Sequence, residues 1–214
     1  DIRAVDTAGK EYGSLQAKQV VCEVEKEGPV HVSIAKRGLL TSADGKPLLM
    51  FISRLHLWRS TSAIRVELTL VNPRDEDSVA VRSVYWRTRR NGPSDQRVVL
   101  PWKSVPAKGE VGVLQHYSFA NAKFRQSLVL DGRLAETRSG PRGELWIGEG
   151  EMGGAWQLQT LRGWQQHPTM LTLADGELKA FVWPGKPVTP VEFSRGMSIT
   201  REYRMHMQAA GKDA

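Results

Sequence analysis

The sequence is poor in cysteine, since Cys22 is the only one among 214 residues. A single cysteine excludes an intramolecular disulfide and any metal cluster built from thiolates. Cys22 lies in an alternating run of apolar and polar residues from Val20 to Val24. We therefore expect it to be buried on a strand, as free cysteines commonly are, rather than to act as a nucleophile.

Long apolar runs are also missing. No segment approaches the roughly 20 apolar residues of a transmembrane helix. No signal peptide stands at the start, and Asp1 is not an initiator methionine. The chain is therefore expected to be a mature or excised piece, whose compartment the missing signal does not reveal. With 40% hydrophobic and 25% charged residues, it has the composition of an ordinary globular protein.

Short catalytic and metal-binding motifs are absent as well. The five histidines show no close ligand spacing such as HxH or HExxH, and the chain has no GxSxG element. The Gly-rich stretch 148–154 lacks the spacing of a phosphate-binding loop. Its carboxylate pair, Glu149 and Glu151, is expected to be solvated. We predict no metal and no cofactor.

Positive charge is in excess, with a formal net charge of +7. This favours an anionic partner, such as an acidic polysaccharide, an anionic lipid or a nucleic acid. The densest basic segment, Arg87–Arg90, is explained equally well by a solvated strand end. The tryptophans are spread over the expected strands instead of marking one basic face, so we expect neither nucleic acid nor membrane as the partner.

Alternating hydrophobicity dominates the chain, as in Ile64–Leu70, and no segment of ten residues has a helical period. Asp-Gly and Asn-Gly pairs recur between the alternating runs and indicate many hairpins. The prediction is an all-β fold, a two-sheet antiparallel β-sandwich of roughly a dozen strands. We expect a lead-in arm or linker at 1–17, one sandwich domain at 18–208 and a tail at 209–214. The proline-rich segment 93–110 is predicted to be a long excursion.

The stretch 163–202 is the richest in aromatic and amide side chains. It begins with Trp164, Gln165, Gln166 and His167, at the open end of a predicted hairpin. Tryptophan can stack on the apolar face of a sugar while amides bond its hydroxyls, so this end is a candidate sugar-binding surface. A tryptophan packed into the core beside an irregular loop is the alternative.

Several segments together resemble the central β-sandwich domain of exo-rhamnogalacturonan lyase-like proteins. They are Gly38 with 48–57, the strand 65–72, and the segments 164–168, 178–184 and 196–202. Their order and spacing are similar over most of 19–207. At Ile199 and Arg201 the chain departs from the family pattern, which has a basic residue and a histidine there.

The resemblance implies β-elimination at a uronate of an acidic glycan, with a barrel domain before this sandwich and an α/α toroid after it. Such a reaction needs a group that neutralises the carboxylate, a base and an acid. From their clustering at loop ends, we hypothesise that Arg162 faces the carboxylate and that His167 or Tyr117 is the acid or base. Trp164 would stack the sugar, and Gln165 and Gln166 would bond its hydroxyls.

Three functions stay open on the sequence. The chain is part of a polysaccharide lyase, a non-catalytic glycan-binding or structural sandwich, or a protein–protein interaction module. A polymeric glycan substrate would place the protein outside the cell or in the periplasm.

Overall fold

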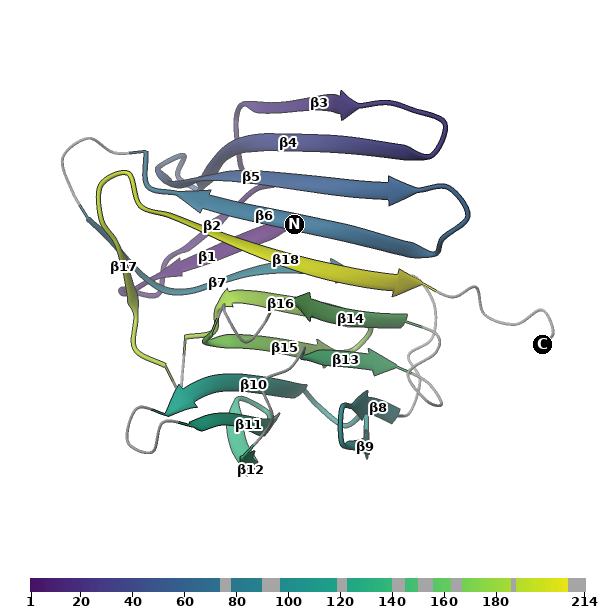
Figure 1. Ribbon diagram of the computed structural model, residues 1–214. Coiled ribbons are helices and arrows are strands. Elements are labelled where there is room, and N and C mark those ends of the chain that lie inside the picture. The colour runs from purple at the N-terminus through teal and green to yellow at the C-terminus, as the bar shows by residue number, and fades with distance from the viewer. Residues whose placement is uncertain are drawn as a thin grey trace. The chain divides into compact units, whose positions relative to one another are not determined.

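The computed structural model describes residues 1–73, 78–89, 97–118, 123–139, 145–149, 156–162, 167–185 and 188–207. These residues form eighteen strands and contain no helix (Figure 1), and hence no helix able to cross a membrane. The strands are β1 (Ile2–Asp6), β2 (Glu11–Gly13), β3 (Val20–Lys26), β4 (His31–Thr41), β5 (Pro47–Trp58), β6 (Ala63–Val71), β7 (Val79–Arg89), β8 (Arg97–Leu100), β9 (Lys103–Pro106), β10 (Val111–Ser118), β11 (Lys123–Leu130), β12 (Arg133–Ser139), β13 (Trp146–Glu149), β14 (Trp156–Leu161), β15 (Thr169–Ala174), β16 (Glu177–Trp183), β17 (Val191–Phe193) and β18 (Ser198–Met207).

The predicted fold class is confirmed: the protein is an all-β, antiparallel sandwich protein. All the strand pairs described below are antiparallel. The strands outnumber the predicted dozen because several have only three to five residues, too few to show a period of two. The chain divides into two compact units, which are described separately.

Unit 1 comprises residues 1–61, 65–87 and 181–202. Its long hairpin β4–β5 is flanked by β3, which pairs with β4. The hairpin turns at 42–46, where the hydroxyl of Ser42 accepts a hydrogen bond from the backbone N–H of Lys46 (3.2 Å). The core of this unit contains Phe51 and the alternating side chains Val66, Leu68 and Leu70, all fully buried.

The N-terminal residues differ from the predicted lead-in arm, because β1 and β2 lie within unit 1. β1 pairs with both β2 and β7, and Ile2, Ala4 and Tyr12 are buried. The carboxylate of Asp1 accepts hydrogen bonds from Arg3 (2.7 Å) and Arg87 (2.9 Å). These strands are too short for their alternation to be recognised, so the sequence pattern looked irregular.

Unit 2 comprises residues 62–64, 88–180 and 203–214. β10 lies between β11 and β15, and β12 pairs with the other edge of β11. A second group joins β9, β8, β13 and β14 in that order. β11 and β12 are connected by the two-residue turn Asp131–Gly132, with φ of 47° and 73°. Positive φ at both positions is the geometry of the tight hairpin turn that Asp-Gly favours.

Three further expectations are corrected. Cys22 is exposed, because β3 is exposed on both of its faces. The segment predicted as an excursion contains β8 and β9, and Pro106 is tolerated because it is the last residue of its strand. Glu149 is fully buried instead of solvated. Its predicted companion Glu151 lies outside the described residues.

Candidate functional site

The residues predicted to form the site are only partly described. Trp164, Gln165 and Gln166 lie outside the described residues. Arg162 directly follows β14, is exposed, and has a positive φ of 57°. His167 and Tyr117, by contrast, lie together in unit 2 although they are far apart in the sequence.

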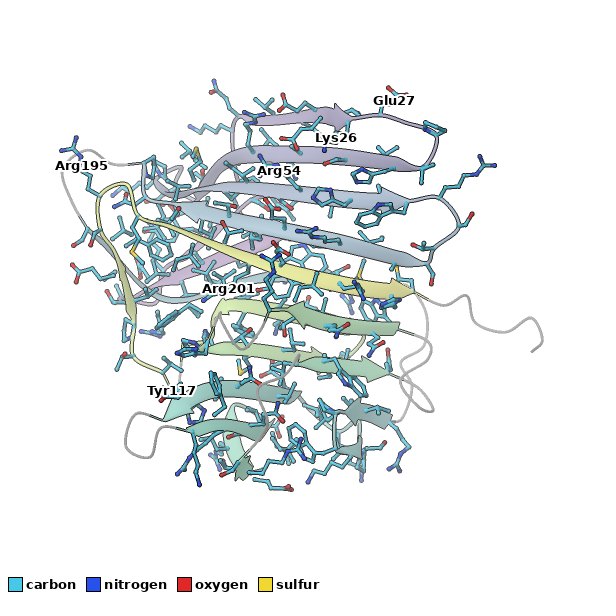
Figure 2. The ribbon with its side chains drawn as sticks, in the orientation of Figure 1. Lys26, Glu27, Arg54, Tyr117, Arg195 and Arg201 are labelled. Atoms are coloured by element: carbon cyan, nitrogen blue, oxygen red, sulfur yellow. The ribbon has the colours of Figure 1, made fainter. Side chains whose placement is uncertain are left out.

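An aromatic cluster forms around these two residues. Tyr117 on β10 lies opposite Phe124 on β11 in the strand register, with ring centroids 5.2 Å apart. His167, which immediately precedes Pro168 and β15, has its ring centroid 5.7 Å from that of Tyr117 and 5.5 Å from that of Phe124. All three side chains are half-buried, so the cluster presents ring surface to solvent. Figure 2 shows Tyr117 near the end of β10.

A row of polar side chains runs beside the aromatic cluster. Since side chains two residues apart share one face of a strand, Gln115 faces the same side as Tyr117. Gln115 lies opposite Thr169 on β15 and Gln126 on β11, and Gln126 lies opposite Arg138 on β12. We call Thr169, Gln115, Gln126 and Arg138 the amide row.

Hydrogen bonds join most of the amide row. Gln126 donates to the amide oxygen of Gln115 (3.0 Å), and Arg138 donates to the amide oxygen of Gln126 (2.9 Å). The guanidinium carbon of Arg138 lies 4.1 Å from the ring centroid of Trp102, a cation–π contact. The row therefore ends in a cation that lies over the ring of an indole.

Some polar atoms of this region have no hydrogen-bond partner among the described residues. They are Nε2 of Gln115, Oγ1 of Thr169, Nε of Arg138 and the indole Nε1 of Trp102. Gln115 and Thr169 are 0% and 1% exposed, respectively. A buried polar group without a partner costs about 1–3 kcal/mol, so such groups are rarely retained for stability alone. Because these atoms are buried, ordered water can satisfy them in the free protein, and a ligand reaches them only when the side chains that cover them move.

The histidine next to this surface has a perturbed acidity. His116 lies between Gln115 and Tyr117 and therefore faces the other side of β10, opposite Arg125. Burial is the main cause that lowers the pKa of His116 below its ordinary value of 6.5, and the charges of Arg125 and His167 lower it further. At neutral pH the imidazole of His116 is therefore neutral.

Unit 1 has a polar face of a different kind, whose residues sequence reasoning did not single out. Arg54 on β5 bonds Glu25 on β3 (2.9 Å) and Glu67 on β6 (3.0 Å), and Figure 2 shows Arg54 on this sheet. Arg65 pairs with Glu202 at 2.9 Å. We call these residues the ion-pair network.

Beside this network lie three rings on β4 and β5. Nε2 of His31 and Nδ1 of His56 are 3.3 Å apart, so one imidazole donates to the other. The ring of Trp58 lies 4.9 Å from that of His31, with an angle of 15° between the planes. Burial is the main cause that lowers the pKa of His56, and the charge of Arg65 adds to it. Counting back from Asp44–Gly45, one of the Asp-Gly pairs of the sequence, would have brought His31 and Trp58 opposite each other.

The described part of the chain contains no cluster of metal ligands. Nowhere in these ranges do three or more His, Cys, Asp or Glu side chains lie close enough to hold a metal ion.

No protein-family model and no curated protein matches the sequence. Among solved structures, similarity is found to a galactose mutarotase related enzyme from Lactobacillus acidophilus, with 10% identity, coverage of 90% of this chain and 72% of that chain, and a TM-score of 0.40. A putative aldose 1-epimerase from Escherichia coli K12 has 12% identity, coverage of 95% and 78%, and a TM-score of 0.43. An α-N-acetylgalactosaminidase from Bifidobacterium bifidum has 13% identity and a TM-score of 0.41, and the chain covers 31% of it.

The resemblance to exo-rhamnogalacturonan lyase-like proteins is wrong. The similar structures are described as mutarotase-related and epimerase proteins, not as domains of rhamnogalacturonan lyases. No family model supports the lyase family either. The β-elimination chemistry that the resemblance implied therefore has no support. The segments behind the resemblance are short strand and turn patterns, which recur in many antiparallel proteins.

Proposed function

We propose that the protein is a carbohydrate-binding β-sandwich protein that holds its ligand at the amide row and the aromatic cluster of unit 2. One observation carries this proposal: Gln115 and Thr169 are buried side by side on adjacent strands, each with a polar atom that lacks a partner among the described residues. Sugars are dense in hydroxyls that both donate and accept hydrogen bonds. They can therefore satisfy an amide N–H and a threonine hydroxyl together.

The neighbouring rings supply the second requirement of sugar recognition. The half-buried rings of Tyr117 and His167 offer apolar surface for the C–H face of a pyranose, while the amide row contacts its edge. In this proposal His167 and Tyr117 position the sugar and do not carry a reaction.

The ligand is proposed to be an acidic oligosaccharide. The chain has a net charge of +7, and Arg138 closes the amide row with its Nε unbonded among the described residues. A guanidinium recognises a carboxylate with two parallel hydrogen bonds, which makes it a natural partner for a uronate. Arg162, exposed at the end of β14, remains a candidate for a further contact with the acid group.

Calorimetric titration with an oligogalacturonate and with a neutral galacto-oligosaccharide of equal length tests the proposal. We expect binding of the acidic ligand, weakening as salt is added because exposed charges are screened. Gln115→Leu and Tyr117→Ala should each reduce the affinity about tenfold, a loss of about 1.4 kcal/mol. Gln159→Leu on β14 is the matched control, since it removes an amide outside the row and should leave the affinity unchanged.

Two results would contradict the proposal. One is no heat of binding with either oligosaccharide. The other is an affinity that Gln115→Leu and Tyr117→Ala leave intact while circular dichroism shows both variants folded. If the neutral galacto-oligosaccharide binds as tightly as the oligogalacturonate, carbohydrate binding stands. The preference for an acidic ligand is then contradicted.

A further inference from the structure

The edge strand β3 of unit 1 is exposed along its whole length. β3 is the outermost strand of its sheet (Figure 1), and its described pairing is with β4. All seven of its residues are exposed, and Val21 and Val24 are 53% and 57% exposed. An edge strand carries a row of free backbone donors and acceptors, which is a template for another strand.

The usual protection of such an edge is weak here. β3 contains no proline. Its two acidic residues are directed into the sheet, since Glu23 pairs with Arg37 on β4 and Glu25 with Arg54 on β5. Charges that are neutralised within the sheet repel an incoming strand less than free charges do. Lys26 and the bulge between Val24 and Lys26 interrupt only the end of the strand.

The sequence of β3 is symmetric about Cys22. Val20, Cys22 and Val24 lie on one face, two residues apart. If a second copy of β3 is laid antiparallel with the two-fold axis at Cys22, each Val20 lies opposite Val24 of the second copy. Centring the pair on Glu23 would oppose two glutamates, and centring it on Val24 would oppose Glu23 to Glu25. Like charges directly opposite each other are destabilising.

We propose that β3 is a homodimer interface, in which the β3 strands of two copies pair antiparallel about Cys22. The pairing continues the sheet of unit 1 into the second copy and satisfies the free backbone groups of both edges. It also brings four valines and two cysteines into contact on one face, and burial of these apolar side chains adds to the backbone hydrogen bonds. A self-complementary patch is the requirement for a two-fold interface.

Sedimentation equilibrium of this chain over a series of concentrations tests the proposal. We expect a monomer–dimer equilibrium. Val24→Lys places a cation opposite Val20 on both sides of the axis and should weaken the dimer at least about tenfold. Leu134→Lys is the matched control, because Leu134 on β12 of unit 2 is 47% exposed and lies outside the interface. It should leave the equilibrium unchanged.

Crosslinking gives an independent measurement on the unaltered strand. Because Cys22 is the only cysteine and is exposed, a short bis-maleimide should join two copies in high yield at concentrations where the dimer forms. Cys22→Ser should abolish the crosslink and leave the dimer. A chain that stays monomeric at every concentration overturns the proposal. So does a dimer that survives Val24→Lys or that the reagent does not link through Cys22.

Discussion

The polar face of unit 1 and the amide row of unit 2 lie on similar antiparallel strands but use their polar groups differently. In the ion-pair network, Arg54 and Arg65 are paired with carboxylates on other strands of the sheet, although Nε of Arg65 has no partner among the described residues. In the amide row, Gln115 and Thr169 are more deeply buried and still have atoms without a partner among the described residues. A face whose charges are paired contributes to folding, whereas a face with spare buried donors keeps groups that ordered water or a ligand can satisfy.

The largest effect is expected from breaking the ion-pair network. Arg54→Met leaves Glu25 and Glu67 as neighbouring carboxylates without their shared cation. It should lower the free energy of unfolding by about 2 kcal/mol, below the range for fully buried pairs because these groups are partly exposed. Urea unfolding measures the loss. Arg37→Met removes a single exposed pair and should cost much less; an equal cost for the two variants would show that the network has no special role.

A smaller and sharper contrast comes from two buried threonines within unit 2. The hydroxyl of Thr160 accepts from the backbone N–H of Leu145 (3.0 Å) and donates to its carbonyl, whereas Oγ1 of Thr169 has no partner among the described residues. Thr160→Val should lower the free energy of unfolding by about 1–2 kcal/mol. Thr169→Val should leave it unchanged or raise it by up to about 1 kcal/mol. Equal losses by urea unfolding would mean that the amide row is satisfied in the free protein.

Acid should weaken both units through two half-buried histidines, His56 and His116. The pKa of His56 in unit 1 and that of His116 in unit 2 are both lowered from 6.5. Below about pH 6.5 the unfolded chain binds protons that the folded chain does not, so stability is full above that pH and falls as the pH drops. Melting temperatures between pH 7.5 and 5 should show this decline. His56→Gln and His116→Gln should each flatten it, and an unchanged slope in both variants would contradict the assignment.

The smallest effect is expected at an exposed turn of unit 1. Hydrogen bonds from Lys10 and Ser42 lower the pKa of Asp44 to about 2. The stability that the ionised Asp44 adds to the folded state is fully present above pH 3.8, the ordinary pKa of an aspartate. It is lost as the pH falls through about 2. Asp44→Asn should shift the melting temperature only slightly, since solvent and salt screen an exposed pair. Titration of the Asp44 carboxyl by nuclear magnetic resonance checks the pKa, and a midpoint near 3.8 would remove the pairing with Lys10.

Much of the fold was accessible from sequence because alternating hydrophobicity and Asp-Gly turns report directly on antiparallel strands. The alternation from Ile64 to Leu70 became β6, and the turn at Asp131–Gly132 became the β11–β12 hairpin. The short strands β1 and β2 were missed, since three to five residues cannot establish a period. Cys22 was expected to be buried, because alternation reveals the faces of a strand but not whether the strand lies at an edge.

The candidate site was predictable only in part, for a related reason. Tyr117 and His167 were chosen as side chains at loop ends, and the structure brings them together. Gln115 and Gln126 gave no local signal, since a glutamine in a strand is usually solvated. Their hydrogen bond depends on the register between two strands, which a single-strand pattern does not contain. The contact between His31 and His56 in unit 1 likewise depends on the register between two strands.

The two-residue turn at Asp131–Gly132 affects how the surface that carries the amide row can change during evolution. The turn and the register shift between Leu128 and Val129 together fix which residue of β12 meets which residue of β11, and so they place Arg138 beside Gln126. Lengthening that turn by one residue would shift the register and direct the other set of β12 side chains toward this face, with no substitution in either strand. Insertion and deletion at this turn therefore exchange the side chains that the face presents while the strand sequences stay intact.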